Sequence, residues 1–161
     1  MQAVTAVFSE PAWTTVAPRV VLCALLGVAL SSLPSLAQAQ STLYERLGGY
    51  DAIAGFVDLA FPRVSTHPEL AHFFRGHSTD SQLRQRQLIV DALCHATGGP
   101  CIYIGRPMKP VHDGLGISAE HWQVFLGIIT TAIEERQFPE AEKKAFLAIF
   151  ERFRPEVVES P

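Results

Sequence analysis

Apolar residues recur at three- and four-residue spacing in four long segments of this chain, and glycine or proline separates the segments. Such spacing places the apolar residues on one face of a helix, and that face must be buried against another helix. Long helices are expected at 51–64, at 81–97, at 119–136 with Ser118 as its cap, and after Pro139, with short ones at 41–47 and 108–112. No alternating strand pattern occurs after Gln40. The sequence therefore predicts an all-α domain in which two long final helices pack against two earlier ones.

The first 39 residues have the pattern of an export signal rather than of this domain. An uncharged apolar run at 20–30 follows Arg19 and precedes the small-residue site Ala37-Gln38-Ala39. The run is too short to span a bilayer comfortably. We therefore expect a signal peptide at 1–39, a mature domain at 40–161, a periplasmic location and no stable membrane insertion after cleavage. An uncleaved anchor is the alternative, because the segment before the run is long and Glu10 balances Arg19.

Charge and cysteine usage narrow the classes of function. The net charge of −3, with no basic run, gives no electrostatic footprint for binding nucleic acid. After cleavage Cys94 and Cys101 would remain in an oxidising compartment, on either side of the segment HATGGP. The glycines and proline of that segment allow the chain to fold back, so a disulfide is expected. Two buried thiols are the alternative.

The candidate metal or cofactor ligands are six histidines. Three of them lie in or near expected turns with polar neighbours: His67, His72 and His77. His95 lies in the last turn of its expected helix, where an imidazole suits the helix dipole. The spacing of His112 and His121 matches no zinc motif, and Cys94 and His95 point to different sides of their helix, which disfavours a Cys–His nucleophile.

His112 stands in a different frame from the other histidines. It ends a short helical run one turn after Met108, it precedes Gly114 and Gly116, and it lies within an irregular segment at 100–116. A segment of this kind can present an imidazole to a large, flat, apolar ligand while the core helices supply the rest of the cage. Haem is the ligand that uses this arrangement, with a neutral histidine bound axially to iron.

The chain from about Leu43 to Phe153 resembles the group 1 truncated haemoglobins. The resemblance rests on LYERLGGYDAI, on the phenylalanine pair at 73–74, on ATGGPCIYIGRPMKPVHDGLGIS and on the helix that bears Trp122. It implies the two-over-two helical sandwich of this family, with haem b as the cofactor. It further implies that His112 is the proximal iron ligand and that Phe74 packs on the haem face.

On the distal side the sequence departs from the family it resembles. Phe61 occupies the position where many members place a tyrosine that holds bound oxygen. Pro62 disfavours the α conformation at Phe61, so a kink is expected there. Counting back from Gly98 places Gln85 and Ile89 at the two distal positions of the third helix, and Gln85 is then the available amide donor.

Four further residues complete the expected cofactor-binding set. Tyr103 and Met108 belong to the frame around the proximal histidine. Arg106 and Lys109 are candidates to meet the haem propionates, because a cation beside a carboxylate at a pocket rim is a natural pair. Solvated side chains are the alternative for both.

The resemblance implies an exported haem protein that binds oxygen, nitric oxide or carbon monoxide at ferrous iron. Nitric oxide dioxygenation is the enzymatic form of this function, and it would need a separate reductase. One alternative is a redox, electron-transfer or sensor protein in which a distal side chain makes the haem six-coordinate. The other is a helical binding module without haem.

Overall fold

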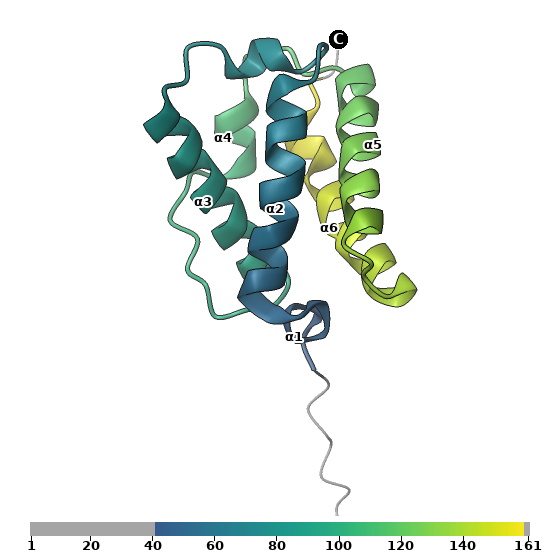
Figure 1. Cartoon of the computed structure of the whole chain (residues 1–161). Coiled ribbons are helices and arrows are strands. Elements are labelled where there is room, and N and C mark those ends of the chain that lie inside the picture. The colour runs from purple at the N-terminus through teal and green to yellow at the C-terminus, as the bar shows by residue number, and fades with distance from the viewer. Residues whose placement is uncertain (1–40, 160–161) are drawn as a thin grey trace, which may run out of the picture. The chain divides into compact units, whose positions relative to one another are not determined.

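The computed structural model describes residues 41–159, so the expected signal peptide lies outside the described residues. The elements are α1 (Leu43–Leu47), α2 (Gly49–Thr66), the 3-10 helix η1 (Ala71–Phe74), α3 (Thr79–Ala96), α4 (Met108–His112), α5 (Ala119–Glu135) and α6 (Glu140–Val157). Figure 1 shows α2 at the centre, with α3 on one side and α5 on the other. No strand occurs in residues 41–159. The prediction of an all-α domain is confirmed.

Local side-chain signals set where several helices begin. The Ser118 side chain accepts a hydrogen bond from the backbone N–H of His121, and the His121 ring accepts one from the backbone N–H of Ser118. The expected cap at Ser118 is confirmed, because such a reciprocal pair satisfies donors that a helix start leaves unpaired. Thr42 caps α1 in the same way, whereas Ser78 caps α3 and starts it two residues earlier than the periodicity predicts.

The long helix α2 continues through Pro62 to Thr66 as one element. The α conformation that proline was expected to disfavour at Phe61 is therefore adopted. Two hydroxyl groups in the next turn, those of Ser65 and Thr66, donate to the carbonyl of Pro62 at 3.1 and 2.7 Å. Val64 beyond the proline is buried, and burial of its side chain supports the last turn of the helix.

The hydrophobic core lies between α2, α5 and α6, and α3 closes it on one side. The rings of Phe56 and Phe146 meet edge to face, with centroids 5.0 Å apart, and both side chains are almost fully buried. Burying a side chain of this size contributes about 1.5–3 kcal/mol. No helix among residues 41–159 is long and apolar enough to cross a membrane.

Candidate haem site

The two elements that carry most predicted haem residues are held by different helices. α3 packs on α2, whereas α4 packs on α6. α4 has no fully buried residue, and α3 buries only residues of its second half. Large apolar side chains stay 43–80% exposed on α3, on α4 and in the segments around α4: Leu83, Ile102, Ile104, Val111 and Leu115. Large exposed apolar side chains are typical of a binding site, and most of these lie in or around the helix that carries His112.

His112 is oriented by its own helix. Its Nδ1 atom lies 2.8 Å from the carbonyl oxygen of Met108, one turn earlier in α4, and the ring is half-buried. A carbonyl only accepts hydrogen bonds, so the Nδ1–H donates, and in the neutral ring Nε2 then keeps its lone pair. Metal-bound histidines are oriented in this way by a second hydrogen bond. The arrangement suits an axial ligand to iron.

Tyr103 and Met108 line a mainly apolar pocket of about 270 Å³ beside α4. Ala92 and Ala96, one turn apart on α3, line the same pocket with Phe153 of α6. Longer side chains at the two alanines would fill this space. The pocket therefore joins two residues predicted to contact haem to the second half of α3.

A short loop before α4 is shaped around Tyr103. The Tyr103 hydroxyl donates to the carbonyl of Arg106 at 2.7 Å, and partial burial raises the pKa of this tyrosine. A Cβ atom on Gly105 would overlap the Tyr103 hydroxyl, so a larger residue at this position would displace the Tyr103 ring. His95 lies exposed at the rim of the pocket, as expected for the last turn of α3.

A disulfide joins Cys94 at the end of α3 to Cys101 in the segment that leads to α4. The prediction of this bridge is confirmed. Gly99 lies inside the closed loop and donates its backbone N–H to the carbonyl of Cys94 at 2.8 Å. A Cβ atom on Gly99 would come within 2.7 Å of the Cys94 sulfur. The disulfide and Gly99 together fix the path of the chain from the end of α3 toward α4.

The predicted distal residues come from three elements. The rings of Phe61 in α2 and Phe74 in η1 meet edge to face, with centroids 5.9 Å apart. Gln85 and Ile89 lie one turn apart on α3, and both are half-buried. The Oε1 atom of Gln85 is buried without a hydrogen-bond partner among the described residues. A buried amide oxygen without a partner is costly, so the side chain is suited to a ligand that supplies one.

Trp122 is a residue that the sequence reasoning used only as part of a resemblance. Its side chain is 3% exposed, and its Nε1 atom is the other buried polar side-chain atom without a partner in residues 41–159. Sequence gives no signal for this property, because an indole in an apolar stripe is normally a core residue.

The two candidate propionate partners lie on the surface rather than in a pocket. Lys109 is 71% exposed, 4.0 Å from Asp113, and Arg106 is exposed. Two further histidines, His72 and His121, pack against the ring of Phe73, with centroid distances of 3.9 and 5.1 Å to that ring. These two histidines are thus not brought together with His112 by the contacts observed.

In this all-α domain His112 is oriented through Nδ1, and Met108 of the same short helix lines an apolar pocket; this arrangement suits a haem protein of the globin class. A profile of the bacterial-like globin family matches residues 42–159. Similarity to individual proteins is equally specific. A group 1 truncated haemoglobin of Mycolicibacterium paratuberculosis is 31% identical over 117 residues, which is 73% of this chain and 84% of the relative. One from Nostoc sp. is 36% identical over 107 residues, covering 66% and 88% of the two chains.

Solved structures agree with these sequence comparisons. The ferric truncated haemoglobin of Tetrahymena pyriformis superposes with a TM-score of 0.67 at 26% identity, over 74% of this chain and all of the other. The chain belongs to the truncated haemoglobins, as its sequence resemblance predicts. The cofactor of this family is haem, with iron at its centre.

Proposed function

We propose that this protein binds oxygen or another diatomic gas at the iron of haem b, with His112 as the proximal ligand. Globins bind small diatomic gases, and the bound haem supplies the iron at which binding takes place. The observation that carries the assignment to His112 is the hydrogen bond of its Nδ1 atom to the Met108 carbonyl, which leaves Nε2 available.

The role of His112 follows from this bond. The Met108 carbonyl fixes the tautomer and restricts rotation of the ring, and it makes Nε2 a more basic ligand. Because the bond lies within one helical turn, ring orientation depends on α4 alone. The other residues of the proposed proximal side, Tyr103 and Met108, then supply apolar contacts to the macrocycle.

The distal side is proposed to be mainly apolar with one polar group. Phe61, Phe74 and Ile89 would exclude water from the bound gas. Gln85 would supply the hydrogen bond, because its amide oxygen is the buried side-chain atom of α3 that has no hydrogen-bond partner in residues 41–159. Its NH₂ group is the donor that bound oxygen requires, and the amide can be turned to present it.

The exposed cations Arg106 and Lys109 lie at the start of α4, and we propose that they pair with the haem propionates. Either pair would be exposed and thus contribute little, on the order of 1 kcal/mol or less. Their role would be to set the orientation of the haem, and they would add little to its binding affinity.

An enzymatic form of this function is nitric oxide dioxygenation. The chain would bind oxygen, and nitric oxide would reach it through the distal side. The iron must be reduced again after each turnover, so the activity needs a separate reductase as electron donor.

We further propose that cleavage after Ala39 delivers the domain to the periplasm. The intact mass of protein from that fraction tests this, and a full-length membrane-bound form would contradict it.

The visible spectrum of the purified protein tests the proposed function. We expect a ferrous five-coordinate spectrum that changes on addition of oxygen or carbon monoxide. A low-spin six-coordinate ferrous spectrum without added gas would instead indicate a redox or sensor protein. Absence of a Soret band after reconstitution with haemin would leave a haem-free helical module.

A further inference from the structure

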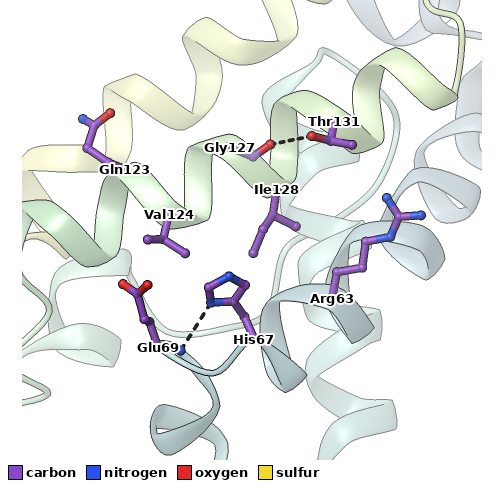
Figure 2. A pocket seen from close by; sticks show the side chains of 8 residues that line it. All are labelled: Arg63, His67, Glu69, Gln123, Val124, Gly127, Ile128 and Thr131. Carbon is purple, nitrogen blue, oxygen red and sulfur yellow. Dashed lines mark hydrogen bonds between the residues drawn. The ribbon is translucent and has the colours of Figure 1, made fainter.

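A second pocket, of about 470 Å³, lies along one side of α5. Its lining comes from the end of α2, the turn that follows and α5, and includes Arg63, Glu69, Val124, Gly127, Ile128 and Thr131. Figure 2 shows His67 and Glu69 beside Val124, and Arg63 toward the Thr131 end of the same helix face. None of these residues belongs to the proposed haem site.

Within residues 41–159, no contact requires glycine at position 127. It lies in the middle of α5, it is exposed, and apart from its chain neighbours and the backbone of its own helix no atom of the described residues lies within 4 Å of the place where its Cβ would be. Glycine inside a helix costs about 1 kcal/mol relative to alanine. Helices keep such a glycine where another backbone must approach closely. Because nothing in residues 41–159 does so, an external partner is indicated.

The residues around Gly127 are suited to contact with a helix. Val124 and Thr131 lie one helical turn before and one turn after Gly127 on its face of α5, and Ile128 lines the same pocket from the edge of that face. Both aliphatic side chains are only partly buried. A small residue flanked by larger apolar ones forms a groove into which the side chains of a second helix can pack.

The two ends of this groove differ in charge. At one end Arg63 donates two hydrogen bonds to Glu135, at 2.7 and 2.8 Å, and this pairing raises the pKa of the arginine. A guanidinium has five N–H groups, so three remain for another acceptor. At the other end Glu69 takes part in no ion pair within residues 41–159. Its carboxylate is therefore open to a cation from outside.

We propose that this face of α5 binds a second copy of the chain, with the two α5 helices antiparallel and in contact at Gly127. The two-fold axis of such a dimer passes between the two α5 helices near Gly127, at right angles to both. It reverses the direction of α5 and leaves α2 of both copies on the same side of the helix pair. Glu69 of each copy then meets Arg63 of the other. A parallel pair would bring like ends together, so charge selects the antiparallel one.

Sedimentation velocity of the haem-loaded full chain, over a range of concentration and salt, measures this association. We expect a monomer–dimer equilibrium that weakens as salt is raised, because the ion pairs at its edge are screened. Gly127→Arg should weaken the dimer at least about tenfold by blocking close approach. Its melting temperature should not fall, because the introduced side chain meets open space and replaces a poor helix former.

Trans-complementation separates this interface from a structural role. Glu69→Lys and Arg63→Glu should each weaken the dimer about tenfold. An equal mixture of the two variants should recover most of the affinity, because the introduced lysine of one copy faces the introduced glutamate of the other in one of the two symmetric contacts. Glu151→Lys on the exposed side of α6 is the matched charge control and should change nothing.

Three results would overturn the proposal. The first is a wild-type chain that stays monomeric at high concentration. The second is a dimer that is indifferent to Gly127→Arg, and the third is a mixture of the two charge variants that shows no recovery.

Discussion

The proximal and distal sides of the proposed haem site are built over different distances along the chain. On the proximal side, His112 and the carbonyl that orients it are four residues apart in one short helix. On the distal side, Phe61, Phe74 and Gln85 come from α2, η1 and α3. The proximal geometry therefore depends on local sequence, whereas the distal geometry depends on how three elements pack. Substitutions should accordingly act on haem retention on the first side and on gas release on the second.

The largest effect is expected at His112. His112→Ala should abolish stable haem uptake, because the proposed axial bond to iron depends on this imidazole, which the Met108 carbonyl orients through Nδ1. Soret absorbance per mole of protein after gel filtration measures it. His112→Gly with added imidazole should recover the Soret band, which tests ligation rather than folding. His95→Ala and His121→Ala are the matched controls, and normal haem content in His112→Ala would refute the assignment.

The disulfide should give the next largest effect. It closes a sequence separation of seven residues, so its loss should lower the free energy of unfolding by about 2–3 kcal/mol. Cys101→Ser tests this in urea, and haem should leave the variant faster because the segment leading to α4 is less restrained. Dithiothreitol should shift the wild-type curve but not that of the variant. Equal urea midpoints for the oxidised and reduced protein would show that the bridge does not stabilise the fold.

Sequence was most informative where a feature depends on neighbours along the chain. Ser118 as a cap, the helical face of α5 and the Cys94–Cys101 bridge all follow from short-range pattern and were confirmed. Pro62 was expected to disfavour the α conformation at Phe61, but α2 continues through both residues, and Val64 beyond the proline is buried. The unpaired atoms of Gln85 and Trp122 could not be predicted, since burial without a partner is a property of tertiary packing and not of residue type.

On the distal side, Phe61→Tyr should slow oxygen release. The new hydroxyl would supply a hydrogen bond worth on the order of 1 kcal/mol, which corresponds to a several-fold lower dissociation rate. Stopped-flow displacement of oxygen by carbon monoxide measures the rate. Phe74→Leu retains an apolar side chain without adding a donor, and it should not slow release. An unchanged rate in Phe61→Tyr would mean that this position does not face the bound gas.

Gln85→Leu should have a smaller effect in the opposite direction. If the amide donates to bound oxygen, its loss should raise the dissociation rate up to several-fold, within the usual worth of one neutral hydrogen bond. The same stopped-flow experiment applies, with the exposed Gln82→Leu on the same helix as the control. The double variant with Phe61→Tyr is informative, because non-additive rates would place both side chains on one ligand. If Gln85→Leu leaves the rate unchanged, the amide does not reach the gas.

The smallest effect is expected where α3 is attached to α2. Arg86 donates two hydrogen bonds to Asp58, at 2.7 and 2.9 Å, and this pairing holds the pKa of Asp58 below its ordinary value. A carboxylate with a depressed pKa stabilises the fold at pH values above its unfolded pKa, and this stabilisation is lost as the pH falls through the folded pKa.

Asp58→Asn should therefore lower the free energy of unfolding by less than about 1 kcal/mol near neutral pH, because the pair is largely exposed, and by progressively less as the pH falls below about 4. Urea titrations across that range measure the difference, and Asp51→Asn, exposed at the start of the same helix, is the control. Haem content should not change, because the ion pair positions the distal wall alone. If the difference in free energy of unfolding between wild type and Asp58→Asn stays constant down to acid pH, Arg86 does not favour the charged form of the carboxylate. Packing rather than this ion pair would then set the position of α3.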